Sequence, residues 1–320
     1  MKRIGVLTSG GDAPGMNAAL RAVVRGAVYN EMQIYGIYRG YEGLMNGDIE
    51  ELGLSSVSDI IHRGGTMLLT ARSSRFITDE GFADALKQIE KFGLDGLVII
   101  GGDGSFKGGL KLFDAGVPTI CIPGTIDNDL GYTDFTIGFD TAVNTVVSIA
   151  SKIRDTSISH GCATIIEVMG RDCGDIALYA GLASGAESIL IPEESMNIED
   201  ICEKMLHSKK RGKHHSLIMM AEGVDISCRE LASILNERTK IDIRTVVPGY
   251  IQRGGSPSAN DRILASRVGY RAVELLHDNV KDRAVGICDN RIIDVNLRTA
   301  IEAENRKPFA DSKLAAILAI

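Results

Sequence analysis

The stretch LVIIGGDGSFKGG, Leu97–Gly109, is a continuous apolar run that ends in two glycines, an aspartate, a third glycine and a serine. The apolar run predicts a strand covered on both faces, with a helix to follow. Glycines let backbone N–H groups approach phosphate oxygens closely, and a helix N-terminus adds the positive end of its dipole. Asp103 would then be placed to hold Mg²⁺ beside the phosphates. Considered alone, the loop is explained about equally well as a tight turn with an Asx hydrogen bond.

The same alternation of short apolar runs and amphipathic segments continues along the chain. This pattern predicts an α/β fold with mostly parallel sheets. The strand-like runs are Ile4–Thr8, Ile34–Ile37, Leu97–Ile100, Thr119–Ile122, Ala163–Val168, Ser188–Ile191, Ser216–Ala221 and Thr245–Val247. One helical pattern has apolar residues from Met16 to Ala27. The other helical patterns cover Asp79–Phe92, Thr141–Arg154, Asn197–Lys209 and Asn260–His277.

Length and composition predict one large or two medium domains, since the chain has 320 residues, of which 44% are hydrophobic. Its 36 glycines suit many tight strand-to-helix turns, and no proline- or serine-rich linker divides it. Strand–glycine turns recur in both halves. We therefore expect two Rossmann-like, three-layer domains that face a shared cleft.

Charge and cysteine usage limit the function classes. The net charge of −7, the absence of tryptophan and the low aromatic content of 5% argue against a nucleic-acid binder or a protein of anionic membrane surfaces. The six cysteines form no CxxC pair, and no apolar run approaches a membrane span. We expect a cytoplasmic protein without a zinc or thioredoxin-like motif.

Two further loops carry candidate chemistry. VLTSGGDAPGMN again runs from a strand into glycines, so Gly11 could meet a nucleotide phosphate. In CIPGTIDNDL, Thr125, Asp127 and Asp129 follow a strand end. A carboxylate there can accept the proton of an attacking hydroxyl, and a second one could bind metal or orient a substrate. A polar turn is the better explanation of this loop taken alone. The P-loop motif GxxxxGK[ST] is absent.

Arginines beside such loops could bind phosphate groups. Arg72 follows an apolar run, and near a phosphate cradle it could stabilise transition-state charge. Arg171, Arg244 and Arg253 could make bidentate contacts to a sugar phosphate, and the AEG segment offers Glu222 as a further candidate. Any one of them could instead be a structural ion pair.

Taken together, these segments closely resemble the bacterial ATP-dependent 6-phosphofructokinases over essentially the whole chain. The supporting strings are LTSGGDAPGMNA, GGDGS, PGTIDND, TIGFDTA, KIRDTSISH, EVMGRDCGD, AEG and QRGGSP followed by DRILASR. The resemblance implies transfer of the γ-phosphoryl group of Mg-ATP to the 1-hydroxyl of fructose 6-phosphate, which gives fructose 1,6-bisphosphate and ADP, the committed step of glycolysis.

The resemblance also implies roles for individual residues. Asp127 would be the general base, Thr125 would assist it, and Arg72 and Arg171 would stabilise the moving phosphoryl group. ATP would be bound by Gly11, Tyr41 (near the adenine), Arg72, Ser73, Gly102, Asp103, Gly104 and Ser105, with Mg²⁺ on Asp103. The sugar phosphate would be held by Thr125, Ile126, Asp127, Asp129, Met169, Gly170, Arg171, Glu222, Tyr250 and Arg253, with Arg244 reaching in from a neighbouring subunit.

Two glycines indicate the phosphoryl donor. Gly104 and Gly124 match the ATP-using pattern of the superfamily, whose pyrophosphate-using relatives carry Asp and Lys there. A side chain at these positions would occupy the path of the α-phosphate.

The family resemblance further implies a larger ATP-binding domain, 1–138 plus 251–301, and a smaller sugar-phosphate-binding domain, 139–250 plus 302–320. It implies a homotetramer regulated by ADP or phosphoenolpyruvate between subunits. The matching effector positions are Arg21, Arg25, Ser58, Asp59, Arg154, Gly185, Glu187, Arg211, Lys213 and His215.

Three positions depart from the family pattern. Cys162 stands where the family has an arginine that contacts the 6-phosphate of the sugar from the neighbouring subunit. Leu54 stands where an effector-site arginine is usual, and Tyr250 stands where a histidine is usual in the substrate loop. We expect weaker or less cooperative binding of fructose 6-phosphate and an altered effector response. Two alternatives stay open, a weakly active regulatory paralogue and a kinase of another phosphorylated sugar such as tagatose 6-phosphate.

Overall fold

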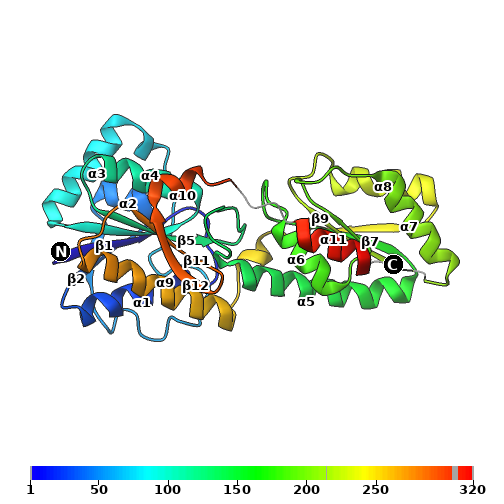
Figure 1. The fold of residues 1–320 in the computed structure, drawn as a ribbon, viewed down its shortest axis with the longest axis horizontal. Helices are drawn as coiled ribbons and strands as arrows, with labels where there is room; N and C mark the ends of the chain where they lie inside the picture. Colours follow the sequence, from blue (N-terminus) through cyan, green and yellow to red (C-terminus); the bar gives the residue numbers. More distant parts are fainter. Residues whose placement is uncertain (1, 214, 305–308, 319–320) are drawn as a thin grey trace. The chain divides into compact units, whose positions relative to one another are not determined.

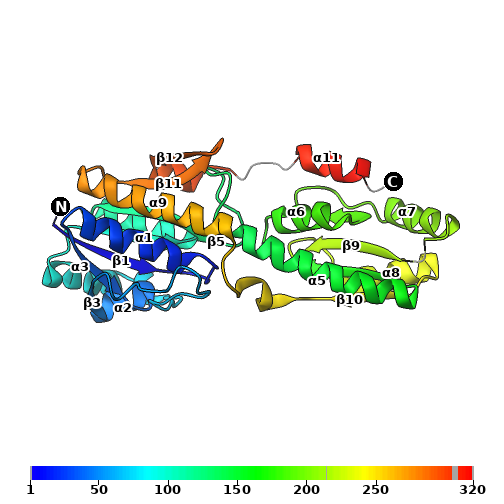
Figure 2. The ribbon, with the colours of Figure 1, turned by 90° about the horizontal axis from the view of Figure 1, so that it is seen from below.

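The computed structural model describes residues 2–213, 215–304 and 309–318, which form two compact α/β units (Figures 1 and 2). The first unit contains the chain up to Thr141 and a second segment that begins at Arg253 and includes α10 (Leu297–Glu302). The second unit contains Ala142–Gln252 and α11 (Phe309–Leu318). The boundary near residue 141 falls inside helix α5 (Phe139–His160).

The first unit is built on a mostly parallel sheet with strand order β12-β11-β5-β4-β1-β2-β3, and β6 pairs with β5 beside it. The pairs from β2 to β11 along this order are parallel, whereas β3 and β12 run antiparallel at the two edges. The strands are β1 (Arg3–Thr8), β2 (Gln33–Ile37), β3 (Ile49–Leu52), β4 (Gly96–Gly101), β5 (Thr119–Thr125), β6 (Ile137–Gly138), β11 (Arg283–Cys288) and β12 (Arg291–Asn296). The prediction of a mostly parallel α/β fold is confirmed.

Helices cover both faces of this sheet. Side chains alternate between the two faces along each strand, and the continuous apolar strands β1 and β4 therefore present apolar side chains on both faces. Leu97 and Ile99 pack with Phe106 in a core beneath α2, α3 and α4, and Tyr41 and Leu44 lie in the same core. Figure 1 shows α1 and α9 on the opposite side, where they run next to each other. The helices are α1 (Met16–Tyr29), α2 (Gly40–Asn46), α3 (Asp79–Phe92), α4 (Asp103–Asp114) and α9 (Ala259–His277), with the short 3-10 helix η1 (Arg75–Ile77) between α2 and α3.

The second unit has a four-stranded, fully parallel sheet with order β10-β7-β9-β8. Ile165 and Ile218 pack against α7 and α8 on one face, while the hydroxyl of Thr164 is hydrogen-bonded to that of Ser157 in α5 on the other. The elements are β7 (Ala163–Val168), α6 (Asp175–Ser184), β8 (Ser188–Leu190), α7 (Ile198–Lys210), β9 (Ser216–Ala221), α8 (Cys228–Thr239), β10 (Ile243–Val246) and the 3-10 helix η2 (Gly249–Arg253).

Within the described residues, none of the helices combines the length and the apolar character that crossing a membrane requires.

The pattern of apolar residues in the sequence predicted most of the central strands of both sheets. The predicted bounds of α3, β7 and β9 agree with the observed ones, and the other predicted strands differ at their ends by a few residues. The sequence patterns missed β3, β6, β11 and β12. β3 and β12 are edge strands: β3 has two exposed residues between two buried ones, and the residues of β12 are exposed or half-buried, so both lack the continuous apolar run of a central strand.

A buried carboxylate joins α9 to the start of α5. Asp261, in the first turn of α9, is 1% exposed. Its Oδ1 accepts a hydrogen bond from the Gly138 backbone N–H at 2.8 Å. Its Oδ2 accepts from the backbone N–H (2.8 Å) and the hydroxyl (2.5 Å) of Thr141. Burial raises the pKa of Asp261, and these three donors oppose that rise.

We expect Asp261→Ala to lower the free energy of unfolding of the first unit by about 1–3 kcal/mol, because buried N–H and O–H donors lose their acceptor. Thermal and chemical denaturation will measure the loss. Asp278→Ala is the matched control, since Asp278 is an exposed residue at the other end of the same helix. Equal stability of the two variants would contradict this role.

Candidate active site

Three loops meet at one edge of the large sheet because β1, β4 and β5 are parallel neighbours. Thr8 pairs with Ile100 and Gly101 pairs with Pro123, so these strands end at the same level. The loops that follow touch each other. A Cβ added at Gly10 would lie 3.3 Å from the Ser105 hydroxyl oxygen. The sheet therefore assembles the GGD, GGDGS and PGTIDND segments into one site.

The N-terminus of α4 forms a cradle that an anion can enter. The helix begins at Asp103, and Gly102 precedes it without a side-chain cap, so its first backbone N–H groups are available for a ligand. Space beside Gly104 is open, since a Cβ built there meets no atom within 4 Å. Asp103 forms an ion pair of 2.7 Å with Lys107, and its side chain is 36% exposed. A reachable carboxylate next to a phosphate cradle fits the oxygen ligand that Mg²⁺ prefers.

Gly124 differs from Gly104 in its surroundings. A Cβ at Gly124 would lie 3.0 Å from Cε of Met16 and 3.1 Å from Cγ2 of Ile100. A side chain there would require these core atoms to shift by a few tenths of an ångström. Position 124 is therefore crowded by the core, whereas the space beside position 104 leaves room for a ligand.

Tyr41 lies beneath the cradle. Its ring stacks on Phe76 at a centroid distance of 4.2 Å, and its hydroxyl donates to the Ser105 carbonyl oxygen at 2.5 Å. The ring fills the space that a side chain at Gly108 would need, with Tyr41 atoms 2.6–2.8 Å from a Cβ there. Burial raises the pKa of Tyr41 well above its ordinary value. Tyr41 therefore supports the start of α4, and its proximity to an adenine stays a prediction.

Arg72 lies on the long loop between β3 and η1, well away from the end of a strand, unlike the GGD, GGDGS and PGTIDND loops. Two hydrogen bonds hold this loop against the end of β1: Thr70 Oγ1 donates to the Gly10 carbonyl at 2.8 Å, and Thr8 Oγ1 donates to the Leu69 carbonyl at 2.7 Å. Arg72 itself is exposed, two residues after Thr70.

Ser73 is oriented by a residue that the sequence analysis did not single out. Its hydroxyl donates to Glu42 Oε2 at 2.6 Å and accepts from the Phe76 backbone N–H at 3.3 Å. Glu42 is in the first turn of α2, and nothing in its sequence context signals this contact.

The PGTIDND loop places the candidate base in a buried position. Asp127 is 1% exposed, and its backbone N–H donates to the hydroxyl of Thr125 at 3.1 Å. Ile126 is buried, and Asp129 is half-buried two residues further on. Arg253 lies in the same unit, where its Nη1 donates to the Asp12 carbonyl at 3.3 Å and fills the space beside Gly11. Arg253, predicted to hold the sugar phosphate, thus contacts the nucleotide-side loop.

In the second unit, a loop following β7 gathers several predicted substrate residues. Oε1 of Glu222 accepts from the backbone N–H groups of Gly170 (3.2 Å) and Arg171 (2.9 Å). Gln252, fully buried and absent from the predicted set, accepts from the Met169 N–H at 3.1 Å and donates to the Gly249 carbonyl at 3.1 Å. Glu222 and Gln252 thereby hold the loop in place.

Other predicted acceptor residues of this unit are more exposed. Arg244 pairs with Asp242 at 2.9 Å, and Tyr250 is 83% exposed. Cys162, by contrast, is buried at the start of β7, with 4% exposure.

The predicted effector residues divide between the units. In the second unit, Glu187 forms an ion pair with Lys213 and accepts from the Leu217 N–H at 2.5 Å. Arg154 donates to the Gly185 carbonyl at 3.2 Å. The pKa of His215 is lowered, mainly by burial and then by the positive charge of Lys213. Arg211 follows directly on α7, and Arg21, Arg25, Ser58 and Asp59 belong to the first unit.

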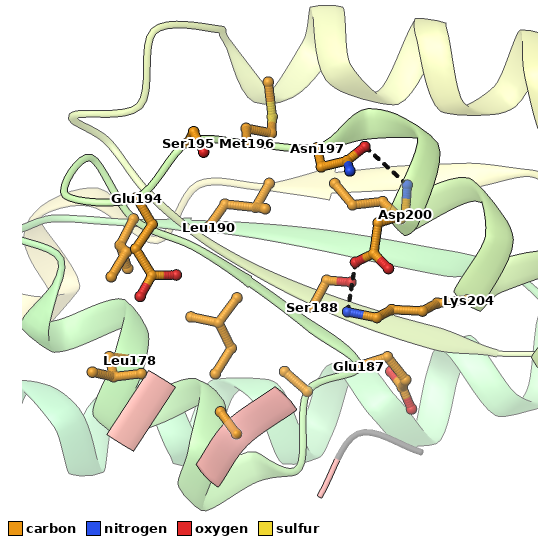
Figure 3. Close-up of a pocket in the computed structure, with 15 residues that line it drawn as sticks. Leu178, Glu187, Ser188, Leu190, Glu194, Ser195, Met196, Asn197, Asp200 and Lys204 are labelled. Carbon is orange, nitrogen blue, oxygen red and sulfur yellow. Dashed lines mark hydrogen bonds and ion pairs between the residues drawn. The ribbon is translucent and has the colours of Figure 1, made fainter. Parts of the chain in front are cut away.

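One of these residues, Glu187, lies in the wall of a pocket of about 240 Å³. Figure 3 shows Leu178 and Leu190 in the pocket, with Glu194 on one side and the Asp200–Lys204 ion pair (2.7 Å) on the other. β8, α7 and α11 contribute to the wall.

Comparisons with known proteins agree over the whole chain. The chain is 60% identical over 320 residues to an ATP-dependent 6-phosphofructokinase of Alkaliphilus metalliredigens and 55% identical over 320 residues to one of Clostridioides difficile, covering all of each. A phosphofructokinase structure from Saccharomyces cerevisiae matches with a TM-score of 0.89 and 32% identity over 94% of this chain, which spans 45% of the yeast chain. A pyrophosphate-dependent phosphofructokinase from Marinobacter aquaeolei shares the fold, with a TM-score of 0.85 and 23% identity. The phosphofructokinase family profile matches residues 3–276, and the chain belongs to that family.

Proposed function

We propose that this chain transfers the γ-phosphoryl group of ATP to the 1-hydroxyl of fructose 6-phosphate, the committed step of glycolysis. One observation carries the proposal: an open anion cradle at α4 and a buried aspartate at the end of β5 lie at the same sheet edge. Phosphoryl transfer depends on positioning and charge stabilisation, and these two parts supply both.

The donor would lie over the glycine-rich loops. The N–H groups at the start of α4 and the backbone near Gly11 would contact the phosphates. Asp103 would hold Mg²⁺, which when bound neutralises phosphate charge. Open space at Gly104 suits a nucleotide donor, which carries an α-phosphate that pyrophosphate lacks. Arg72, Ser73, Gly102, Ser105 and Tyr41 complete the proposed nucleotide site.

The chemistry would proceed by in-line attack. Asp127 accepts the proton of the 1-hydroxyl, the hydroxyl oxygen bonds to the γ-phosphorus, and the bond from that phosphorus to the bridging oxygen breaks to release ADP. Thr125, whose hydroxyl accepts from the Asp127 N–H, keeps the loop in position. Arg72 and Arg171 stabilise the charge on the moving group.

A further set of residues would hold the acceptor. The proposed set is Thr125, Ile126, Asp127, Asp129, Met169, Gly170, Arg171, Glu222, Arg244, Tyr250 and Arg253. Glu222 and Gln252 favour this proposal because they hold the Met169–Arg171 loop in one conformation.

We further propose a cytoplasmic homotetramer whose effector, ADP or phosphoenolpyruvate, binds at the positions named above. The cationic groups of Arg154 and Lys213, close to Gly185 and Glu187, support an anion site in the second unit. Buried Cys162 keeps a different acceptor sugar, such as tagatose 6-phosphate, as a second candidate.

The reaction is tested by ADP release with ATP and fructose 6-phosphate, repeated with pyrophosphate as donor and with tagatose 6-phosphate as acceptor. We expect turnover with the first pair. Turnover only with another pair would reassign the substrate, and no turnover with any pair would favour a regulatory paralogue.

We expect Asp127→Asn to lower kcat by about 10²–10⁴-fold, because the amide cannot accept the hydroxyl proton. ATP affinity, measured by equilibrium binding, stays within twofold of wild type. Asp134→Asn, on the same loop, is the control that keeps most of the activity. A kcat for Asp127→Asn close to wild type would refute the role of the base.

Gly104→Asp tests the donor assignment. The open space around Gly104 accepts the side chain, so the melting temperature stays close to wild type. The new carboxylate repels the ATP phosphates, and we expect the KM for ATP to rise at least about tenfold. Gly53→Asp, at another glycine with open space and no left-handed φ, is the control. Unchanged use of ATP by Gly104→Asp would contradict a phosphate at this position.

Cys162→Arg tests the acceptor site. A restored charge-assisted contact to the 6-phosphate is worth about 1.5–3 kcal/mol, so the KM for fructose 6-phosphate should fall by roughly one to two decades. Cys162→Ser, which adds no charge, should leave this KM within twofold of wild type. A KM that is already low in wild type and unaffected by Cys162→Arg would show that the missing arginine is immaterial.

A further inference from the structure

Asn128 separates the two aspartates of the PGTIDND loop and has an uncommon backbone conformation. Its φ of +54° lies in the left-handed region, which asparagine tolerates better than most L-residues. The chain direction therefore changes between Asp127 and Asp129. A glycine would meet this backbone requirement at least as well, so the backbone alone gives no reason for an asparagine side chain.

The side chain of Asn128 ties this turn to the segment that leads into β6. Its Oδ1 accepts from the Thr136 backbone N–H at 2.9 Å, and its Nδ2 donates to the Asp134 carbonyl at 3.2 Å. The Thr136 hydroxyl lies 3.3 Å from the same Oδ1 and donates to the Thr125 carbonyl at 2.7 Å. Donor and acceptor groups of one amide are thus both used within the loop.

These bonds close a ring around the proposed base. Before Asp127 in the chain, the Thr125 carbonyl accepts from the Thr136 hydroxyl. After Asp127, the side-chain amide of Asn128 accepts from the Thr136 backbone N–H. The segment after Thr136 is itself fixed, because β6 pairs with β5 and Gly138 donates to buried Asp261. The Asp127 backbone is consequently held from both sides by an anchored strand.

We propose that Asn128 is a positioning residue whose side-chain amide holds Asp127 in the orientation that accepts the proton of the acceptor hydroxyl. The inference rests on the proposed role of Asp127 as base. A displacement of a reacting group by about 1 Å can cost about 10²-fold in rate. Loss of the amide should therefore lower kcat and leave nucleotide binding, which uses other loops, unchanged.

Asn128→Gly separates the side chain from the backbone requirement, since it preserves the left-handed turn. In the full-length enzyme we expect kcat to fall about 10–100-fold while the KM for ATP stays within twofold. Asn290→Gly is the matched control: Asn290 also has a left-handed φ, of +61°, in the exposed β11–β12 turn, and its kcat should equal wild type.

Thr136→Val provides a second, nearly isosteric variant that removes the hydroxyl from the ring and keeps the Thr136 N–H. It should lower kcat by itself. Combined with Asn128→Gly, the loss should be smaller than the product of the two single losses, because both act through the same ring.

The inference is overturned if Asn128→Gly retains more than half of the wild-type kcat, or if the effects of the two variants multiply. It is also overturned if the KM for ATP rises in parallel with the loss of kcat, which would indicate a general structural role. If Asn128→Gly does not fold, Thr136→Val becomes the test, and a wild-type kcat for this variant overturns the inference. Turnover by Asp127→Asn at the wild-type rate would instead show that Asp127 is not the base, and this inference would then fail together with the proposed function of Asp127.

Discussion

The parallel pairing of β1, β4 and β5 is the constraint on which the site depends. Neighbouring strands lie about 4.8 Å apart, so the turns at their carboxyl ends must share a small space. The Ser9 N–H donates to the Ile100 carbonyl at 2.9 Å, and this bond attaches the turn after β1 to β4. A Cβ at Gly101 would lie 2.6 Å from the Ser9 carbonyl oxygen. The loops can converge only because glycine stands at this contact.

Side chains below the loops then determine their conformation. Tyr41 holds the start of α4 through the Ser105 carbonyl, Glu42 holds Ser73, and Asn128 holds the turn after Asp127. These three contacts set the geometry of a surface whose backbone N–H groups and arginines can face phosphates, although the chain has a net charge of −7.

The second unit uses the same physical arrangement. The Glu222 N–H donates to the Val168 carbonyl at 2.9 Å, so the turn after β9 is attached to the end of β7. The Glu222 carboxylate then accepts two N–H groups of the next loop, at Gly170 and Arg171. Arg171 has a φ of +53°, and these two bonds support that left-handed backbone. In both units strand pairing sets where a loop begins, and one side-chain carboxylate or amide then fixes the loop backbone by hydrogen bonds.

The sequence by itself determined the fold class and identified the candidate loops that the structure brings to one edge of the sheet. Continuous apolar runs ending in glycine revealed the central strands, and β7, β9 and α3 were predicted with their observed bounds, because burial on both faces or one helical face leaves a clear periodicity. Only the tertiary structure placed Glu42 beside Ser73, Gln252 behind Met169, and Arg253 against Gly11. It also distinguished crowded Gly124 from open Gly104. These contacts join residues far apart in the chain, or depend on which atoms fill a given space, and neither property leaves a local pattern.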